Sequence, residues 1–234
     1  RSANDTVEAK AMNLLFEAVQ WLADGHNWLG PSGILERVGQ HIVFVAAVVS
    51  ISTLIALPIG LYIGHTGRWK NLVMIGTGAA RAVPTLGLLT LVGLWLGIGW
   101  QAPLIALIAL AIPPIIAGAY SGVISSQGSS DAARAIGLTE GQILTQLEIP
   151  AGAPLILAGV RSAVLQVIAT ATLAAYTADL GLGRFLYTGL KTRDYGQMIG
   201  GAIVVVALAL VTDAILAGLI RLLRSRTHSD SQAI

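Results

Sequence analysis

Long apolar stretches that carry no charge alternate with short polar segments along this chain. About 20 helical residues cross the hydrocarbon layer of a membrane, which is about 30 Å thick, and residues 42–64 form one uncharged stretch of this kind. The uncharged region between Arg81 and Asp131 is too long for one crossing, and the Gly- and Pro-containing segment 97–103 divides it. The pattern predicts five membrane-spanning helices, over residues 42–64, 72–96, 103–124, 154–178 and 198–223.

The first forty residues are more polar and predict an amphipathic helix. Within residues 5–23 apolar positions recur at helical spacing, Asp5 and Glu8 suit a capping box, and Gly25 suits the end of the helix. Such a helix either lies flat on the bilayer or packs on a soluble partner. We take residues 1–40 as an interfacial segment, residues 41–223 as the transmembrane domain and residues 224–234 as a polar tail.

Residues 125–150, which we call the elbow, form a polar segment between two predicted spans. Ser130 suits the N-cap of a first short helix, and Gly137 permits the left-handed conformation that ends it. Thr139 and Gln142 then form a capping box for a second helix, and we expect Pro150 to end that helix. The segment predicts two short helices that form a rigid knob outside the lipid, suited to docking into a partner.

Composition supports an all-α integral membrane protein. Of the 234 residues 55% are hydrophobic and 11% are charged, and the mean hydropathy is +0.76, so a soluble globular enzyme is excluded. The net charge of +2 is too small to form a basic face, so we expect no nucleic-acid partner. The chain has no cysteine and its four histidines are scattered, so we expect no metal site.

Two other classes of protein need features that the chain does not display. A secondary transporter needs its own substrate and ion site, usually with inverted repeats and interior carboxylates. An intramembrane enzyme needs a convergent nucleophile, base or metal set within the spans. The chain also lacks the Gly-x-x-x-x-Gly-Lys-Ser/Thr phosphate loop, so we expect no ATP bound by that device and no catalysis by this chain.

The elbow carries a recognisable spacing. The run Asp131-Ala132-Ala133-Arg134-Ala135-Ile136-Gly137, followed after nine residues by Leu147-Glu148-Ile149-Pro150, resembles the EAA loop of ATP-binding-cassette importer permeases. That pattern is Glu-Ala-Ala, three residues, Gly, nine residues, Ile, any residue, Leu, Pro. Asp131, Leu147 and Ile149 depart from it conservatively. Further runs are similar to permeases for glycine betaine, carnitine and choline, at residues 82–86, 112–115, 159–163, 169–174 and 181–183.

The resemblance implies a coupling role for the elbow and a set of partners. The elbow would be cytoplasmic and would dock onto ATP-hydrolysing subunits through Asp131, Ala132, Ala133, Arg134, Gly137, Leu147, Ile149 and Pro150. The N-terminus is then outside and the C-terminus cytoplasmic, in a bacterial or archaeal plasma membrane, and the slight bias of positive charges agrees. Two cassette subunits would hold ATP and Mg, a second permease (a copy or a paralogue) would complete the pathway, and an extracytoplasmic binding protein would select the solute.

The same resemblance indicates the solute and leaves one alternative within the class. It implies glycine betaine, choline or carnitine, with methionine or another small solute as the alternative. An aromatic cage that binds a quaternary ammonium needs clustered Trp or Tyr, and the Trp residues fall at predicted span ends instead. We therefore expect the outer loop 179–195, with Asp179, Arg184 and Lys191, to dock the binding protein.

Charged residues and helix breakers within the spans are the pathway and gate candidates. A charged side chain there faces the bundle, meets water or extends to the membrane surface. Arg81 is either a structural contact or a gate or coupling element, and Arg161 either extends to the surface or lines the pathway. Pro84 bends its span, and Tyr120 is a candidate pathway residue. Glycines let helices pack closely in lipid, and Gly118, Gly122 and Gly159 are among them.

Overall fold

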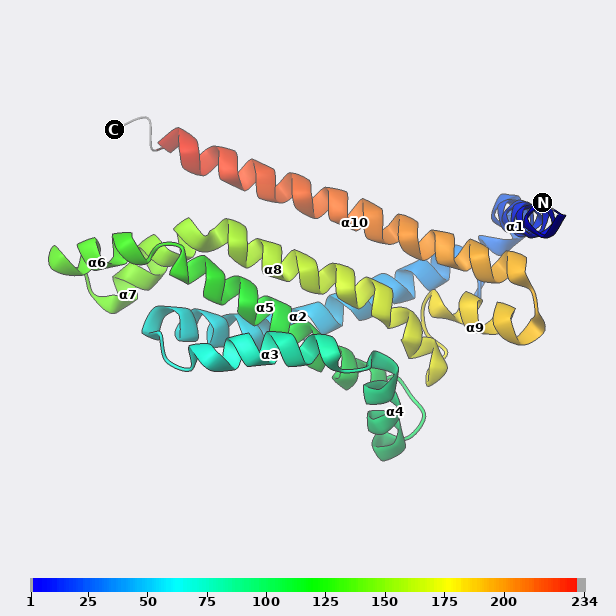
Figure 1. The fold of residues 1–234 in the computed structure, drawn as a ribbon, viewed down its shortest axis with the longest axis horizontal. Coiled ribbons are helices and arrows are strands. Elements are labelled where there is room, and N and C mark those ends of the chain that lie inside the picture. The colour runs from blue at the N-terminus through cyan, green and yellow to red at the C-terminus, as the bar shows by residue number, and fades with distance from the viewer. Residues whose placement is uncertain (1, 231–234) are drawn as a thin grey trace. The chain divides into compact units, whose positions relative to one another are not determined.

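The computed structural model describes the backbone of residues 2–230, and the side chains of this range except those of 2–6, 72, 74, 77, 79–81 and 223–230. The described chain contains helices and no strand (Figure 1). These helices are α1 (Ser2–Ala23), η1 (Gly25–Asn27), α2 (Ile34–Thr66), α3 (Lys70–Ala82), α4 (Thr85–Leu96), α5 (Gln101–Ile124), α6 (Gln127–Ala135), α7 (Glu140–Gln142), η2 (Ile143–Glu148), α8 (Ile149–Thr170), η3 (Ala171–Tyr176), α9 (Gly183–Thr192) and α10 (Tyr195–Asp230).

Four helical segments within the described residues are long and apolar enough to cross a membrane. They cover Ile34–Thr66, Gln101–Ile124, Glu140–Tyr176 and Tyr195–Leu222. They contain the first, third and fifth predicted spans almost completely and most of the fourth, and the loop predicted after residue 96 separates α4 from α5. The prediction of an all-α membrane protein is confirmed.

The second predicted span, residues 72–96, is two helices and not one. Helix α3 ends at Ala82 and α4 begins at Thr85, so each is shorter than the about 20 residues of a crossing. Pro84 explains the division, because its ring removes a backbone donor and restricts the residue before it. The Pro84 carbonyl instead accepts the N–H of Leu88, 3.0 Å away, and so starts α4.

Helix α2 begins at Ile34, eight residues before the predicted start at residue 42. Its first turns contain polar residues, yet a buried stripe at helical spacing runs through them: Ile34, Arg37, His41, Phe44, Val45 and Val48. Burial of the His41 ring is tolerated because both of its nitrogens have partners. The N–H of Leu182 donates to Nδ1, 3.4 Å away, and Nε2 lies 3.0 Å from the Ile168 carbonyl. Tertiary partners therefore let polar residues continue the buried face.

The chain forms two compact units. The first comprises the described residues of Arg1–Ala47 with Leu89–Ala106 and Ile168–Leu210. In it α1 begins at Ser2, so the predicted cap at Asp5 is wrong, and the Trp21 ring packs edge-on to Phe185 with centroids 5.2 Å apart. The N-terminal helix thus packs on the segment that contains α9.

The second unit comprises Val48–Leu88, Leu107–Val167 and the described residues of Val211–Ile234. Small residues hold its helices together, as predicted for Gly118, Gly122 and Gly159. A methyl group at Gly118 of α5 would lie 2.6 Å from the Gly159 Cα of α8, and one at Gly122 would lie 2.8 Å from the Gly152 carbonyl oxygen. The backbones of α5 and α8 therefore approach to a distance that only glycine permits.

Candidate functional site

The elbow folds through local turn chemistry. Helix α6 ends at Ala135, and Gly137, just beyond its C-cap, has a φ of +92° in the left-handed region. The Leu138 N–H donates to the Ala133 carbonyl and the Gly137 N–H to the Arg134 carbonyl, at 3.1 and 3.0 Å, which is the Schellman pattern of a helix end. Thr139 and Gln142 form the predicted capping box at the start of α7. The predicted left-handed conformation at Gly137 is confirmed.

Two parts of the predicted elbow differ in the structure. Ser126, not Ser130, stands at the N-cap of α6, and Ser130 is a buried residue within the helix. Pro150 does not end the second helix, because the helical run continues from Glu140 to Tyr176. The turn before Pro150 widens into the π-helix η2, in which the Ile149 N–H donates to the Leu144 carbonyl five residues earlier. The widened turn accommodates Pro150, which has no backbone N–H to donate.

A buried polar cluster, which sequence reasoning missed, joins the elbow to the end of α2. The Glu148 side chain is 2% exposed, and its Oε2 lies 2.6 Å from His65 Nδ1. The Ser130 hydroxyl donates to Glu148 Oε1 at 2.9 Å. His65 Nε2 lies 3.1 Å from Glu140 Oε2. The available signal was Glu148 itself, a carboxylate among the apolar residues Leu147, Ile149 and Pro150.

The exposed side of the elbow is charged and compact. Arg134 donates to both carboxylate oxygens of Glu140, at 2.8 and 3.0 Å, and to Asp131 at 2.9 Å. The hydrogen bonds to Glu140, then those to Asp131, raise the pKa of the Arg134 guanidinium. Two of the three charged residues, Asp131 and Arg134, are thus fixed relative to each other within one helical turn.

The remaining predicted elbow residues differ in exposure. Ala132, Gly137 and Pro150 are exposed, Leu147 and Ile149 are half-buried, and Ala133 is buried within this chain. Because Ala133 is covered, a docking partner would meet its neighbours instead. Ile136 is 79% exposed, an apolar side chain on a polar knob.

The intramembrane charges lie in the second unit. Arg161 of α8 donates to both oxygens of Asp213 of α10, at 2.6 and 2.7 Å. This partner is not among the alternatives predicted for Arg161, which were extension to the surface and lining of the pathway. Tyr120 is half-buried in α5, and Pro84 lies between α3 and α4. The Arg81 side chain lies outside the described residues.

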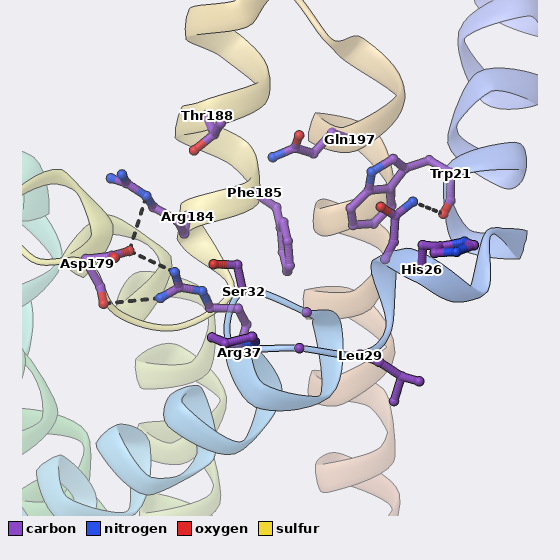
Figure 2. A pocket seen from close by; sticks show the side chains of 14 residues that line it. Trp21, His26, Leu29, Ser32, Arg37, Asp179, Arg184, Phe185, Thr188 and Gln197 are labelled. Atoms are coloured by element: carbon purple, nitrogen blue, oxygen red, sulfur yellow. Dashed lines mark hydrogen bonds and ion pairs between the residues drawn. The ribbon is translucent and has the colours of Figure 1, made fainter.

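A pocket of about 600 Å³ lies in the first unit (Figure 2). Arg37 and Arg184 both contact Asp179 Oδ1, at 2.9 and 3.2 Å. The wall also contains Trp21 and Phe185, and hydroxyl, amide and imidazole groups of Ser32, Asn27, Gln197, Thr188 and His26. Two arginines and one aspartate make the lining cationic. The structure brings Asp179 and Arg184 together, whereas Lys191 is exposed in the last turn of α9 and does not line the pocket.

Helix α2 supports the loop that carries Asp179. The Gly181 N–H donates to Gln40 Oε1 at 3.2 Å, and Arg37 donates to the same oxygen at 3.0 Å and to the Asp179 carbonyl at 3.2 Å. Gly181 has φ of +67° and would press any side chain against His41. These contacts fix the loop next to the pocket, and no sequence signal indicated Arg37.

Substitution of Asp179 by alanine is expected to destabilise the protein by about 1 to 2 kcal/mol, because the Arg37 side chain is 7% exposed and loses the Asp179 carboxylate that it contacts. The Arg184→Ala variant is the control, since its side chain is 44% exposed and its pair contributes less than about 1 kcal/mol. Thermal melting of the detergent-purified protein measures both changes. Equal melting temperatures for the two variants would contradict the assigned role of Arg37.

Comparison with known proteins agrees with this architecture. The model of the family "Binding-protein-dependent transport system inner membrane component" matches residues 56–229. The carnitine transport permease protein OpuCB of Listeria monocytogenes is 32% identical over 191 residues, which cover 81% of this chain and 85% of that protein. The osmoprotectant import permease protein OsmW of Salmonella typhimurium is 32% identical over 201 residues, covering 82% and 92%.

A solved structure has the same fold. A chain of the inward-facing MetNI methionine ABC transporter superposes with a TM-score of 0.69 at 19% identity, covering 81% of this chain and 95% of its own. The family match covers the elbow and all the spans except residues 34–55 of α2. The chain therefore belongs to the family of inner-membrane components of binding-protein-dependent transport systems, as a multi-pass permease subunit of an ATP-binding-cassette importer.

Proposed function

We propose that this permease subunit imports osmoprotectants of the glycine betaine, carnitine and choline type. The observation that carries the proposal is the 32% identity to a carnitine permease across 81% of the chain. A glycine betaine/carnitine/choline permease of Bacillus subtilis, 28% identical over 185 residues, also supports it. Methionine is the second candidate, since the structural neighbour belongs to a methionine transporter.

The elbow couples the permease to separate ATPase subunits that bind ATP and Mg. Its exposed face offers Asp131, Ala132 and Ile136, an acidic rim around an apolar side chain. An exposed apolar residue on a rigid polar knob is suited to insertion into a groove of a partner. Two such subunits and a second permease, either a copy of this chain or a paralogue, complete the importer, and closure of the ATPase pair tilts the spans.

The cationic pocket docks an extracytoplasmic binding protein. Trp21 and Phe185 provide an aromatic wall, and Arg37 and Arg184 leave a net positive charge beside Asp179. An acidic side chain of the binding protein complements that charge. With the pocket outside and the elbow in the cytoplasm, the N-terminus is extracytoplasmic and the C-terminus cytoplasmic.

Uptake into proteoliposomes tests the solute and the energy source together. The complete importer, reconstituted with its ATPase subunits and binding protein, is supplied with labelled glycine betaine, carnitine, choline or methionine. We expect ATP-dependent accumulation of at least one of the first three and none of methionine. Accumulation of methionine alone would overturn the osmoprotectant assignment. Accumulation without ATPase subunits would instead indicate a secondary transporter.

The same assay tests the elbow through Gly137→Val. A β-branched residue is strained at the φ of +92°, so the end of α6 is displaced, and we expect ATP-dependent uptake to fall by at least about tenfold while the protein still inserts. Gly141→Val is the matched control, because a methyl group meets nothing within 4 Å at either position and Gly141, in α7, does not have the positive φ of Gly137. Unchanged uptake by the Gly137 variant would remove the elbow from the mechanism.

A further inference from the structure

We propose that His65 is a positioning residue for coupling, which holds the elbow to the end of α2 and needs a bound proton to do so. This inference rests on the coupling role proposed above for the elbow. His65 itself lies in the last turn of α2 and not in the elbow. The His65 imidazole contacts two carboxylates from different parts of the elbow, that of Glu140 at the start of α7 and that of Glu148 at the end of η2.

The contact between the ring and Glu148 is short and shielded from water, whereas the Glu140 side chain is 59% exposed. Nδ1 lies 2.6 Å from Glu148 Oε2 and Nε2 lies 3.1 Å from Glu140 Oε2. The His65 side chain is 13% exposed, and the Glu148 side chain is almost fully buried. Shielding strengthens hydrogen bonds between charged groups relative to those in water. The cluster is therefore a strong link between α2 and the elbow.

Proton occupancy follows from the geometry. Both ring nitrogens face carboxylate oxygens, and a neutral imidazole has one donor and one lone pair. One proton must therefore lie on Nε2 toward Glu140, and a second between Nδ1 and Glu148 Oε2, whichever of those two atoms holds it. Without the second proton, a lone pair of the ring faces the lone pairs of a buried carboxylate, and the contact becomes repulsive.

The neighbouring groups hold the two carboxylates in position. Ser130 of α6 donates to the other oxygen of Glu148, and Arg134 donates to both oxygens of Glu140 and to Asp131. The carboxylates are thus held in place for a cationic partner. The carboxyl end of a helix also favours a positive charge, and His65 lies there in α2.

This arrangement gives His65 a mechanical role. Ser130 in α6, Glu140 in α7 and Glu148 in η2 all connect through the cluster to one residue of α2. Displacement of the elbow by a docked ATPase subunit is then transmitted to α2 as well as to α8, which continues directly from η2. Loss of the proton would release α2 while leaving α8 attached.

The test measures the ratio of solute imported to ATP hydrolysed by the reconstituted importer between about pH 6 and about pH 9. For the natural chain we expect this ratio to fall by about fivefold as pH rises. His65→Gln cannot bind the second proton, so its ratio should be low and independent of pH. His65→Lys retains a cation that reaches both carboxylates, so its ratio should stay high to a higher pH. Lys70→Gln is the control, because Lys70 is exposed at the start of α3 and belongs to none of the sites described above.

The outcomes separate this inference from the proposed function. If the natural chain shows no ATP-dependent import, the coupling role of the elbow fails and the inference fails with it. If the natural chain imports solute and His65→Gln retains both its ratio and its pH profile, only the inference is overturned. A low ratio for both His65→Gln and His65→Lys with the natural pH profile would assign His65 to packing and also overturn it. Gel filtration of each variant confirms that the amounts of folded protein are equal.

Discussion

Replacement of Gly118 by leucine is expected to abolish accumulation of folded permease. Helices α5 and α8 meet at Gly118 and Gly159, where an added methyl group at either position would lie within 2.7 Å of the opposite Cα. Backbone atoms cannot move aside as a flexible side chain can, so the two helices must separate along their contact. Helices in lipid attract each other mainly through van der Waals contacts, which small residues allow by letting the backbones approach closely. Separation of α5 and α8 therefore removes much of the attraction between them.

Gly218→Leu is the matched control for that experiment. Gly218 lies within α10, and a methyl group there meets nothing within 4 Å. Fluorescence-detected gel filtration of tagged variants measures the folded fraction, which we expect to fall by at least about tenfold for Gly118→Leu and to stay near the natural value for Gly218→Leu. Comparable yields for the two variants would show that the contact between α5 and α8 is dispensable.

The second large effect is expected at the ion pair between Arg161 and Asp213. Replacement of Arg161 by leucine leaves the Asp213 carboxylate without the partner that donates two hydrogen bonds to it, in the middle of an apolar helix. An unpaired charge in a membrane span is costly. We expect either single variant, Arg161→Leu or Asp213→Leu, to lose most of its folded yield and to melt at a lower temperature.

The double variant distinguishes charge pairing from a separate role of either residue. Replacement of both partners by apolar residues removes the unpaired charge, and such replacements are often neutral for stability. The folded yield of the Arg161→Leu, Asp213→Leu protein should therefore exceed that of both single variants. If instead the losses add, each side chain has its own partner and the pair does not explain the two charges.

The spans and the turns of the elbow were predictable because their signals are local. An apolar stretch such as 103–124 fixes its own helix whatever surrounds it, and α5 occupies Gln101–Ile124. Gly137, Thr139 and Gln142 act within one turn of the chain, and the structure confirms the left-handed conformation of Gly137 and the capping box. Most of the fold and the outline of the elbow followed from such signals.

The side-chain contacts of the candidate sites were not predictable, because they join distant parts of the chain. His65 and Glu148 are 83 residues apart, Arg161 and Asp213 are 52 apart, and Arg37 meets the Asp179 carbonyl over 142 residues. Sequence spacing says nothing about such pairs. Ser130 illustrates the result: its type and position suited a helix cap, but it lies within α6 and donates to Glu148.

The division between α3 and α4 restricts what can surround this part of the membrane domain. The chain leaves helical geometry at residues 83–84, near the middle of the apolar segment 72–96. A helix end leaves its last carbonyl groups without intrahelical donors, and acyl chains supply none. Irregular backbone at membrane depth persists only beside protein or water. The flank of the subunit at Val83 and Pro84 therefore cannot be bathed in lipid tails, and a neighbouring polypeptide or an aqueous channel adjoins it.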